Sequence, residues 1–334
     1  MLILDDLDLI IAEFIRNESL MSFEEIAQLV HAFQFQNNTF YRQHCIEKKI
    51  GVIVDSIDCI PSFEVEYFKG KFVPSVDDLS LRKGMCFETS GTLNGEKTKI
   101  YRDEGYFKLR SLTIQKQGED NWFKRYRDRV KIICLDKANR RNQNDFKEQY
   151  SVLNNIVGYF GNDESRFYNH NDNFYKIIDE VIDAAAKQAP LVLIGPSYYF
   201  SDIIIRIKDE GIIIPINNQL LIMDSGGLKN KCLHQFYKHY KEDLFKTFGL
   251  QTVNYKNTYA MTEMGSQISD DEQGKKVVPR WAKIKLLDEN GDENNTTGKI
   301  VIWDLLNRAN IFCIKTNDRA CYKDDGLIIY GKEL

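Results

Sequence analysis

Two neighbouring stretches, LVLIGPSYYFSDIIIRIKDEG at residues 191–211 and NQLLIMDSGG at residues 218–227, decide the fold class. The first begins with an apolar run that ends in Gly195 and Pro196, as a short buried strand does. It continues as a helical pattern that ends at Gly211, a residue type favoured just after a helix. The second stretch is another apolar run, closed by two glycines. Strand, helix and strand in this order predict a βαβ unit in a parallel sheet.

Further helices can be placed on either side of this unit. A capping box begins at Ser22 and opens a helix that is expected to reach about Phe33. The region that follows, which contains IPSFEVEYFKGKFVPS at residues 60–75, has the composition of a loop. Helical patterns also cover residues 173–187 and 231–248.

The C-terminal part of the chain has a different sequence pattern. From about residue 277 it consists of short alternating strands and turns, such as AKIKLLDENGD and GKIVIWDL. The sequence therefore predicts a single α/β domain over residues 1–334, with an α/β core over about residues 1–276 and a β-rich portion over about residues 277–334.

Composition excludes several classes of protein. The 334 residues carry a formal net charge of −4, whereas general nucleic-acid binders usually show a basic excess. The seven cysteines are scattered without a CxxC pair, so neither a zinc knuckle nor a disulfide framework is indicated. No apolar run approaches the roughly 18 residues of a membrane span, and the N-terminus lacks the basic start of a secretory signal. We expect a soluble cytoplasmic protein.

The stretch ETSGTLNGEKTKIYRDE, residues 88–104, has the composition of an anion-binding loop. It offers hydroxyl donors, glycines that let backbone N–H groups approach an anion, and two cations. These residues are Thr89, Ser90, Gly91, Thr92, Gly95, Lys97 and Lys99. The loop is not a Walker loop, which has four residues between its glycines and a lysine directly after the second. Taken alone, it could equally be a solvated turn between two strands.

A second motif, NTYAMTEMGSQ at residues 257–267, changes this interpretation. The first loop resembles the TSGTTGxPK phosphate-binding signature of the adenylate-forming superfamily, and the second motif resembles its YGxTE signature. Tyr259, Thr262 and Glu263 match the second signature, with Ala260 where glycine is usual. The two motifs occur in the expected order, about 170 residues apart, and together they are much more specific than either alone.

Further segments narrow the resemblance to the acyl-protein synthetase (LuxE-like) family of bacterial luciferase operons. The resemblance covers roughly residues 30 to 334. Its segments are MDSGGLKNK at 223–231, VVPRWAKIKLLD at 277–288, GKIVIWDLLNRAN at 298–310 and TNDRACYKDDGLIIYGKEL at 316–334. The resemblance implies an enzyme that uses ATP and Mg²⁺ to convert a carboxylic acid, which we expect to be a fatty acid, into an acyl-adenylate. The acyl group then passes to a thiol.

The resemblance also implies roles for individual residues. The loop from Thr89 to Lys99 would hold the β- and γ-phosphates, although whether Lys97 or Lys99 contacts them stays open. Thr262 would touch the α-phosphate, and Glu263 would hold Mg²⁺, a cation that prefers carboxylate oxygens. Each of these side chains also has a purely structural alternative, such as a solvated turn.

The nucleotide's other end would be held by residues elsewhere in the chain. Tyr259 would stack on adenine, and Gly226 and Gly227 would let the backbone approach the base. Asp318 matches the aspartate that binds the ribose hydroxyls. Lys229 would contact the acyl carboxylate or a phosphate, unless it is a surface lysine at a helix start.

The acyl acceptor is the part that the sequence leaves open. Full-length ligases carry a mobile C-terminal domain, which we expect to be absent here, and we expect no counterpart of the tail cysteine that is acylated in LuxE-like proteins. Cys313 and Cys321 are the nearest thiols, and both are more typical of buried structural cysteines. An acyl carrier protein, an acyl reductase or coenzyme A could accept the acyl group instead.

The alternatives to an acyl-protein synthetase are a CoA ligase of the phenylacetate type, an enzyme that acylates an amine, and a non-catalytic acyl-binding partner of a reductase. Acid chain length and oligomeric state also stay open.

Overall fold

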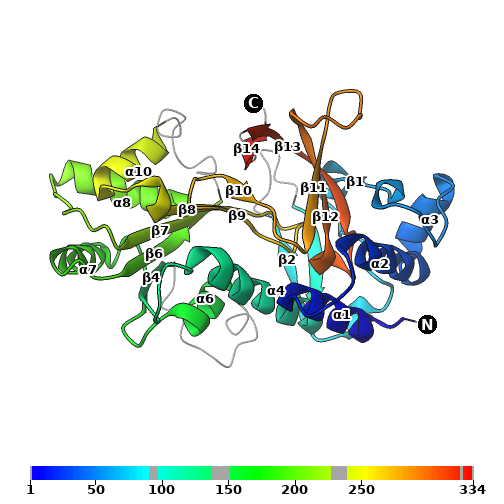
Figure 1. The fold of residues 1–334 in the computed structure, drawn as a ribbon, viewed down its shortest axis with the longest axis horizontal. Helices are drawn as coiled ribbons and strands as arrows, with labels where there is room; N and C mark the ends of the chain where they lie inside the picture. Colours follow the sequence, from blue (N-terminus) through cyan, green and yellow to red (C-terminus); the bar gives the residue numbers. More distant parts are fainter. Residues whose placement is uncertain (1, 90–96, 137–150, 227–238, 324–325, 333–334) are drawn as a thin grey trace. The chain divides into compact units, whose positions relative to one another are not determined.

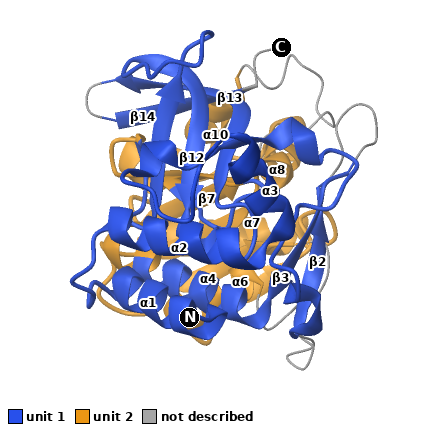
Figure 2. Cartoon of the chain, turned by 90° about the vertical axis from the view of Figure 1, so that its right-hand side faces the viewer, with its two compact units in different colours: residues 1–116, 261–268, 276–334 blue, residues 117–260, 269–275 orange. Residues whose placement is uncertain are grey.

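The computed structural model describes residues 2–89, 97–136, 151–226, 239–323 and 326–332. The chain separates into two compact units, which Figure 2 shows in different colours. Unit 1 comprises residues 1–116, 261–268 and 276–334, and unit 2 comprises residues 117–260 and 269–275. The predicted division into one domain with a β-rich portion after about residue 276 stays a prediction.

Unit 2 contains the parallel sheet that the opening stretches predicted. Its strands are β4 (Lys131–Leu135), β5 (Arg166–Tyr168), β6 (Leu191–Pro196), β7 (Leu220–Ser225), β8 (Tyr255–Tyr259) and β9 (Ile268–Asp270). They follow the order β9-β8-β7-β6-β4-β5, and the pairs β4-β5, β4-β6, β6-β7 and β7-β8 are parallel. Strands β6 and β7 are the two runs of the expected βαβ unit, with helix α8 between them.

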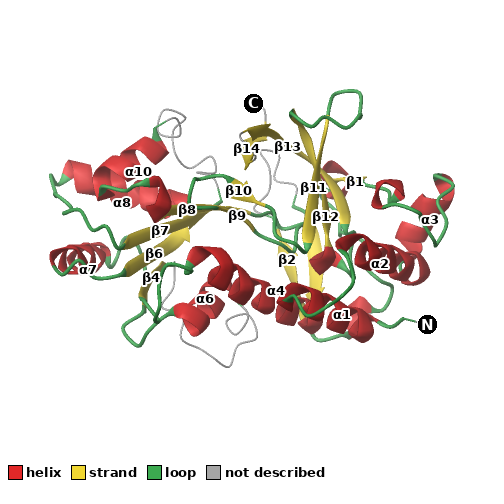
Figure 3. Cartoon of the chain, viewed as in Figure 1, coloured by secondary structure: helices red, strands yellow, loops and turns green. Residues whose placement is uncertain are grey.

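Helices cover one face of this sheet and form the core of unit 2. They are α7 (Phe174–Ala186), α8 (Ser197–Asp209) and α10 (Tyr240–Phe248). Unit 2 also contains α6 (Val152–Phe160). Alternate strand residues such as Leu191, Leu193 and Ile222 pack with apolar residues of α7, α8 and α10. Figure 3 shows these three helices beside β6 and β7. The intervening strand residues are buried as well, which explains why these strands read as continuous apolar runs.

Unit 1 is built from helices and mainly antiparallel strands (Figure 1). The helices are α1 (Leu4–Arg16), α2 (Phe23–Asn37), α3 (Thr39–Glu47) and α4 (Glu104–Gln117). The main sheet contains β10 (Lys276–Val277), β11 (Ala282–Leu287), β12 (Thr297–Asp304), β13 (Cys313–Lys323) and β14 (Gly326–Lys332), in the order β11-β12-β13-β14-β10. The short strand β1 (Phe63–Glu64) pairs with β13, and β2 (Gly84–Glu88) pairs with β3 (Lys99–Asp103) in a separate two-stranded sheet.

Short single-turn helices connect these elements. They are η1 (Ile57–Cys59), η2 (Val65–Phe68), η3 (Leu79–Leu81), η4 (Gly118–Trp122), η5 (Thr252–Asn254) and η6 (Leu305–Asn307). Of these, η6 follows β12 directly and contacts the turn at residues 261–265 through Leu306 and Asn307.

The N-terminal half of unit 1 holds more helix than expected. The capping box at Ser22 is present, with Ser22 accepting from the Glu25 backbone N–H at 3.2 Å, but α2 continues to Asn37. A second helix, α3, begins at Thr39, where a loop was expected. Asn38 ends one helix and caps the next, because its side-chain oxygen accepts the Tyr41 N–H at 3.0 Å.

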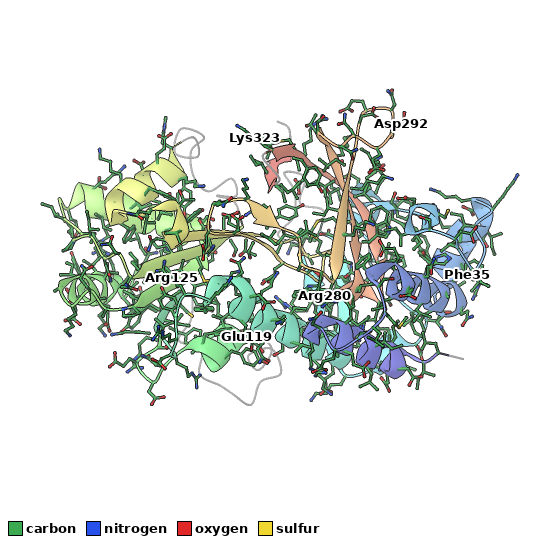
Figure 4. The ribbon with its side chains drawn as sticks, in the orientation of Figure 1. Phe35, Glu119, Arg125, Arg280, Asp292 and Lys323 are labelled. Atoms are coloured by element: carbon green, nitrogen blue, oxygen red, sulfur yellow. The ribbon has the colours of Figure 1, made fainter. Side chains whose placement is uncertain are left out.

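The first helix, α1, is tied to the rest of unit 1 by polar contacts. Arg280 is labelled in Figure 4. Its guanidinium lies 4.2 Å from the centre of the Phe14 ring and donates to Asn17, the residue that ends α1. Buried Arg308 forms ion pairs with Asp8 of α1 and Asp103 of β3. An acidic residue on α1 is therefore part of a buried ion-pair network.

Candidate active site

The β2–β3 hairpin holds the two ends of the expected phosphate loop. Glu88 pairs with Lys99 across the hairpin. Beyond this pair, the Thr89 N–H donates to the Thr98 carbonyl at 3.0 Å, and the Thr98 N–H donates to the Thr89 hydroxyl at 2.9 Å. The loop's ends are therefore closed by mutual hydrogen bonds. Ser90, Gly91, Thr92 and Gly95 lie outside the described residues.

Both loop lysines lie beside one carboxylate. The ammonium groups of Lys97 and Lys99 lie 3.6 and 3.1 Å from the carboxylate oxygens of Glu88. A hydrogen bond from Lys99 holds the pKa of Glu88 below its usual value. All three side chains are about half exposed. Both ammonium groups are therefore accessible to solvent, and Glu88 would compete with any anion for them.

The Thr-Glu motif forms a tight turn between β8 and β9. The Met264 N–H donates to the Met261 carbonyl at 3.1 Å, which closes a turn with Thr262 and Glu263 at its centre. Glu263 is only 5% exposed, whereas Thr262 is half-buried. The structural alternative of a solvated glutamate is therefore wrong.

Asp304, at the end of β12, holds the second half of this turn. Its buried carboxylate accepts the backbone N–H groups of Gly265 at 2.7 Å and Ser266 at 2.8 Å, and the Ser266 hydroxyl at 2.6 Å. Gly265 lies so close to η6 that an added Cβ would be 2.5 Å from the Leu306 Cβ. Only glycine allows this approach without displacement of backbone.

Arg102 of β3 connects the hairpin to the turn. Its guanidinium donates to the backbone carbonyls of Thr262 and Glu263, each at 3.3 Å. Asn307 of η6 also donates to the Glu263 carbonyl, at 2.9 Å. The two sequence motifs, far apart in the chain, are therefore joined by direct hydrogen bonds within unit 1.

In unit 2, the expected adenine-binding residues follow neighbouring strand ends. Ser225 of β7 pairs with Thr258 of β8, so Gly226 and Tyr259 come directly after paired positions on parallel strands. Ligands of open α/β sheets bind at such carboxyl ends. Gly226 has a φ of 65°, which L side chains rarely adopt. Gly227 and Lys229 lie outside the described residues.

A buried carboxylate fixes these two strand ends. Asp224 is 2% exposed and accepts from the Tyr240 hydroxyl at 2.7 Å, the Tyr255 hydroxyl at 2.9 Å and the Asn257 amide at 2.8 Å. Burial raises the pKa of Asp224, and the three donors act in the opposite direction by stabilising the ionised form. Asp224 thereby ties the end of β7 to β8 and α10.

Asp318 and the two candidate thiols lie on β13 of unit 1. Asp318 is half-buried, and its backbone N–H donates to the Thr316 hydroxyl at 3.1 Å. Cys313 is fully buried, and burial raises the pKa of its thiol, so it is a structural cysteine. Cys321 is partly exposed, and its sulfur lies 2.8 Å from the Tyr330 hydroxyl.

Three residues that shape the site were not predicted. Arg102, Asp304 and Asn307 are buried polar side chains that contact the Thr-Glu turn. A signal for Arg102 does exist, since it occupies an inward position in the alternating strand KIYRD. Asp304 similarly ends the apolar run IVIWD, where a charged residue needs a partner.

The described residues hold no group of three or more histidine, cysteine, aspartate or glutamate side chains that could bind a metal ion. Magnesium does not require one, because it commonly uses one or two carboxylates together with phosphate oxygens and water. In the described parts of the chain, no helix is both long and apolar enough to cross a membrane.

Comparison with known proteins identifies relatives by sequence. No protein-family model matches the chain. It is 24% identical over 260 residues to the long-chain-fatty-acid–luciferin-component ligase of Aliivibrio fischeri, an alignment that covers 77% of this chain and 66% of the relative. It is 25% identical over 277 residues to the ligase of the same description from Vibrio harveyi, with 77% and 67% covered. The chain thus spans about two thirds of the length of these relatives.

Comparison with solved structures shows the fold. An open conformation of 2-hydroxyisobutyryl-CoA ligase, in complex with 2-HIB-AMP and CoA, matches with a TM-score of 0.64 and 11% identity, covering 91% of this chain and 73% of that one. The same ligase in its thioesterification state matches with a TM-score of 0.65, covering 92% and 66%. The predicted α/β fold of adenylate-forming enzymes and the resemblance to acyl-protein synthetases are confirmed.

Proposed function

We propose that this protein uses ATP to activate a carboxylic acid as an acyl-adenylate, and that the acyl group is then transferred to a thiol. The observation that carries the proposal is the hydrogen bonding of Arg102 to the carbonyls of Thr262 and Glu263. It joins the strand that follows the Ser/Thr/Gly/Lys loop to the turn that carries the acidic motif. A solvated turn in each place would not need this connection.

The chemistry explains why these residue types are needed. A carboxylate is a poor acyl donor, and its attack on the α-phosphorus of ATP brings two anions together. The step forms a carboxylate oxygen–phosphorus bond, breaks the bond between the α-phosphorus and the bridging oxygen, and releases pyrophosphate. Cationic and N–H donors must offset the repulsion. The thiol then displaces AMP from the acyl carbon and loses its proton.

Unit 1 supplies the groups for the triphosphate. Thr89 with Lys97 or Lys99 would bind the β- and γ-phosphates, and Thr262 would contact the α-phosphate. The undescribed loop residues Ser90, Gly91, Thr92 and Gly95 would add hydroxyl and backbone donors. Glu263 would hold Mg²⁺, because it offers a buried carboxylate beside the residue assigned to the α-phosphate. The cation, when bound, supplies charge neutralisation at the phosphates.

The remaining candidates would hold the nucleoside and the acid. Tyr259 would stack on adenine beside the backbone of Gly226 and Gly227, and Asp318 would accept the ribose hydroxyls. Lys229 would contact the acyl carboxylate or a phosphate. Two neighbouring strand ends place Gly226 and Tyr259 together, which supports a shared role.

The acid is proposed to be a fatty acid, because both sequence relatives are described as long-chain-fatty-acid ligases. The acceptor would be coenzyme A, an acyl carrier protein or a cysteine of an acyl reductase. A phenylacetate-type CoA ligase remains the second candidate, supported by the fold shared with 2-hydroxyisobutyryl-CoA ligase. A non-catalytic acyl-binding partner is disfavoured by the buried Glu263. A cytoplasmic location would supply ATP and reduced thiols.

The test is pyrophosphate release with ATP, Mg²⁺ and a series of carboxylic acids. We expect acid-dependent release by the wild-type chain and a decrease of at least about 100-fold for Glu263→Gln, since a charge-stabilising group at a reacting phosphate is worth this much. Glu293→Gln is the matched control, because Glu293 forms an ion pair with Lys285 at 2.7 Å and has an exposed side chain. Absence of release with every acid would refute the function, and an active Glu263→Gln variant would refute the site.

A further inference from the structure

Arg102 is a buried arginine with neutral hydrogen-bond partners. It is 1% exposed, and burial lowers its pKa. Its guanidinium donates to the side-chain oxygens of Asn307 at 2.6 Å and Asn310 at 3.2 Å, and it lies 4.5 Å from the centre of the Tyr106 ring. Its other two acceptors are backbone carbonyls of the Thr-Glu turn. A charge at this depth is costly unless its hydrogen bonds are satisfied, and here they are.

The carbonyls that Arg102 holds belong to the two residues assigned to catalysis. Thr262 and Glu263 each offer one backbone oxygen to the same guanidinium nitrogen, and Asn307 donates to the second of them. Asn307 is itself fixed, because its own backbone carbonyl accepts from Gln34 at 2.9 Å. The orientation of the turn's peptide planes therefore depends on the planar guanidinium of Arg102.

We propose that Arg102 is a positioning residue for adenylation. It fixes the backbone of Thr262 and Glu263 so that the threonine hydroxyl and the glutamate carboxylate are held toward the phosphates and Mg²⁺. The inference rests on the proposed function. Its role is indirect, because Arg102 acts on the backbone of the turn.

Unit 1 contains a second buried arginine that separates this role from simple structural support. Arg308 is also 1% exposed, but its partners are the carboxylates of Asp8 and Asp103, the latter at 2.8 Å. Replacement of Arg308 therefore breaks an ion-pair network that holds α1, whereas replacement of Arg102 releases the turn. The two arginines are matched in burial and differ in what they hold.

The experiment compares Arg102→Lys with Arg308→Lys. A lysine keeps the charge but cannot reach two amides and two carbonyls with the planar geometry of arginine. For Arg102→Lys we expect a roughly 10- to 100-fold lower kcat for pyrophosphate release, a several-fold higher half-saturating Mg²⁺ concentration and little change in KM for the acid. Positioning errors of this kind cost up to about 100-fold. Arg308→Lys should lower the thermal midpoint at least as much as Arg102→Lys does, and its kcat should stay within about twofold of wild type.

A second measurement does not depend on activity. Hydrogen exchange followed by mass spectrometry reports the amides of residues 261–266, where Met264 and Gly265 donate within or beside the turn. We expect faster exchange there in Arg102→Lys and not in Arg308→Lys. Unchanged exchange, or faster exchange with unchanged kcat and Mg²⁺ dependence, would overturn the inference. A wild-type chain without pyrophosphate release would refute the proposed function instead, whatever the exchange shows.

Discussion

The close approach of Gly265 to η6 gives the sharpest prediction. In Gly265→Ala, the new methyl group would lie 2.5 Å from the Leu306 Cβ and 3.1 Å from a Tyr106 ring carbon. Carbon atoms prefer about 3.5–4.0 Å, so the turn must move by about 1 Å. Overpacking of this kind costs about 1–3 kcal/mol. The hydrogen bonds from Gly265 and Ser266 to Asp304 would lengthen as well.

We therefore expect Gly265→Ala to lose about 2–4 kcal/mol of unfolding free energy, or roughly 5–15 °C in thermal midpoint for a unit of this size. The assay is thermal unfolding followed by circular dichroism, with pyrophosphate release measured at a temperature where the variant is folded. Activity should fall too, because the turn carries Glu263. The control is Gly158→Ala in α6, where the added Cβ meets nothing within 4 Å. It should be neutral or stabilising by about 0.5–1 kcal/mol. A Gly265→Ala variant as stable and active as wild type would refute the reasoning.

Three other substitutions test separate parts of the account. Arg308→Met should cost about 3–5 kcal/mol at pH 8, because Asp8 loses the arginine of its ion pair and buried Asp103 keeps only the more distant Arg82, at 3.9 Å. Without the arginine, the pKa values of Asp8 and Asp103 would be raised in the folded variant, so the stability of the variant should fall as pH rises. Urea midpoints of the variant and the wild type at pH 5 and pH 8 check this. A larger loss of stability at pH 5 than at pH 8 would contradict it. Glu88→Gln should lower KM for ATP about two- to fivefold, since it releases Lys97 and Lys99 from their ion pairs with Glu88. An ATP titration that shows an unchanged or higher KM would contradict a role of those lysines in binding phosphate. Asp224→Asn should destabilise the chain by about 1–3 kcal/mol and raise KM for ATP more than it changes kcat, because the carboxylate accepts three hydrogen bonds at the strand ends. Thermal unfolding and steady-state kinetics would detect both effects, and a fall in kcat alone would argue against the assignment.

The sequence predicted those parts of the fold that depend on local pattern. The runs at residues 191–194 and 220–223 lie in strands of a parallel sheet because they are apolar throughout, and the helix between them ends shortly before Gly211. The length of α2 and the existence of α3 were missed. After Phe33 the sequence reaches Asn37 and Asn38, and the weak helix propensity of asparagine is outweighed by tertiary packing of buried side chains such as Tyr41.

The motifs for the candidate site could be read from the sequence, but not the residues that hold them. Thr262 and Glu263 are recognisable by their spacing in a known signature. Arg102 stands out only as a charged residue at an inward strand position, and Asn307 does not stand out at all. Their contact with each other is not readable, because a hydrogen bond between positions 205 residues apart leaves no periodic signal. Which side chains support a turn is decided by the tertiary fold, and local sequence carries little information about it.

The central claim is that the carboxylate attacks the α-phosphorus of ATP. The most direct measurement uses a fatty acid labelled with ¹⁸O in both carboxylate oxygens, followed by mass spectrometry of the nucleotide product. The account predicts AMP that carries one ¹⁸O atom, because one carboxylate oxygen stays on phosphorus when the acyl group leaves. Release of unlabelled AMP, or of ADP in its place, would contradict adenylation of the acid.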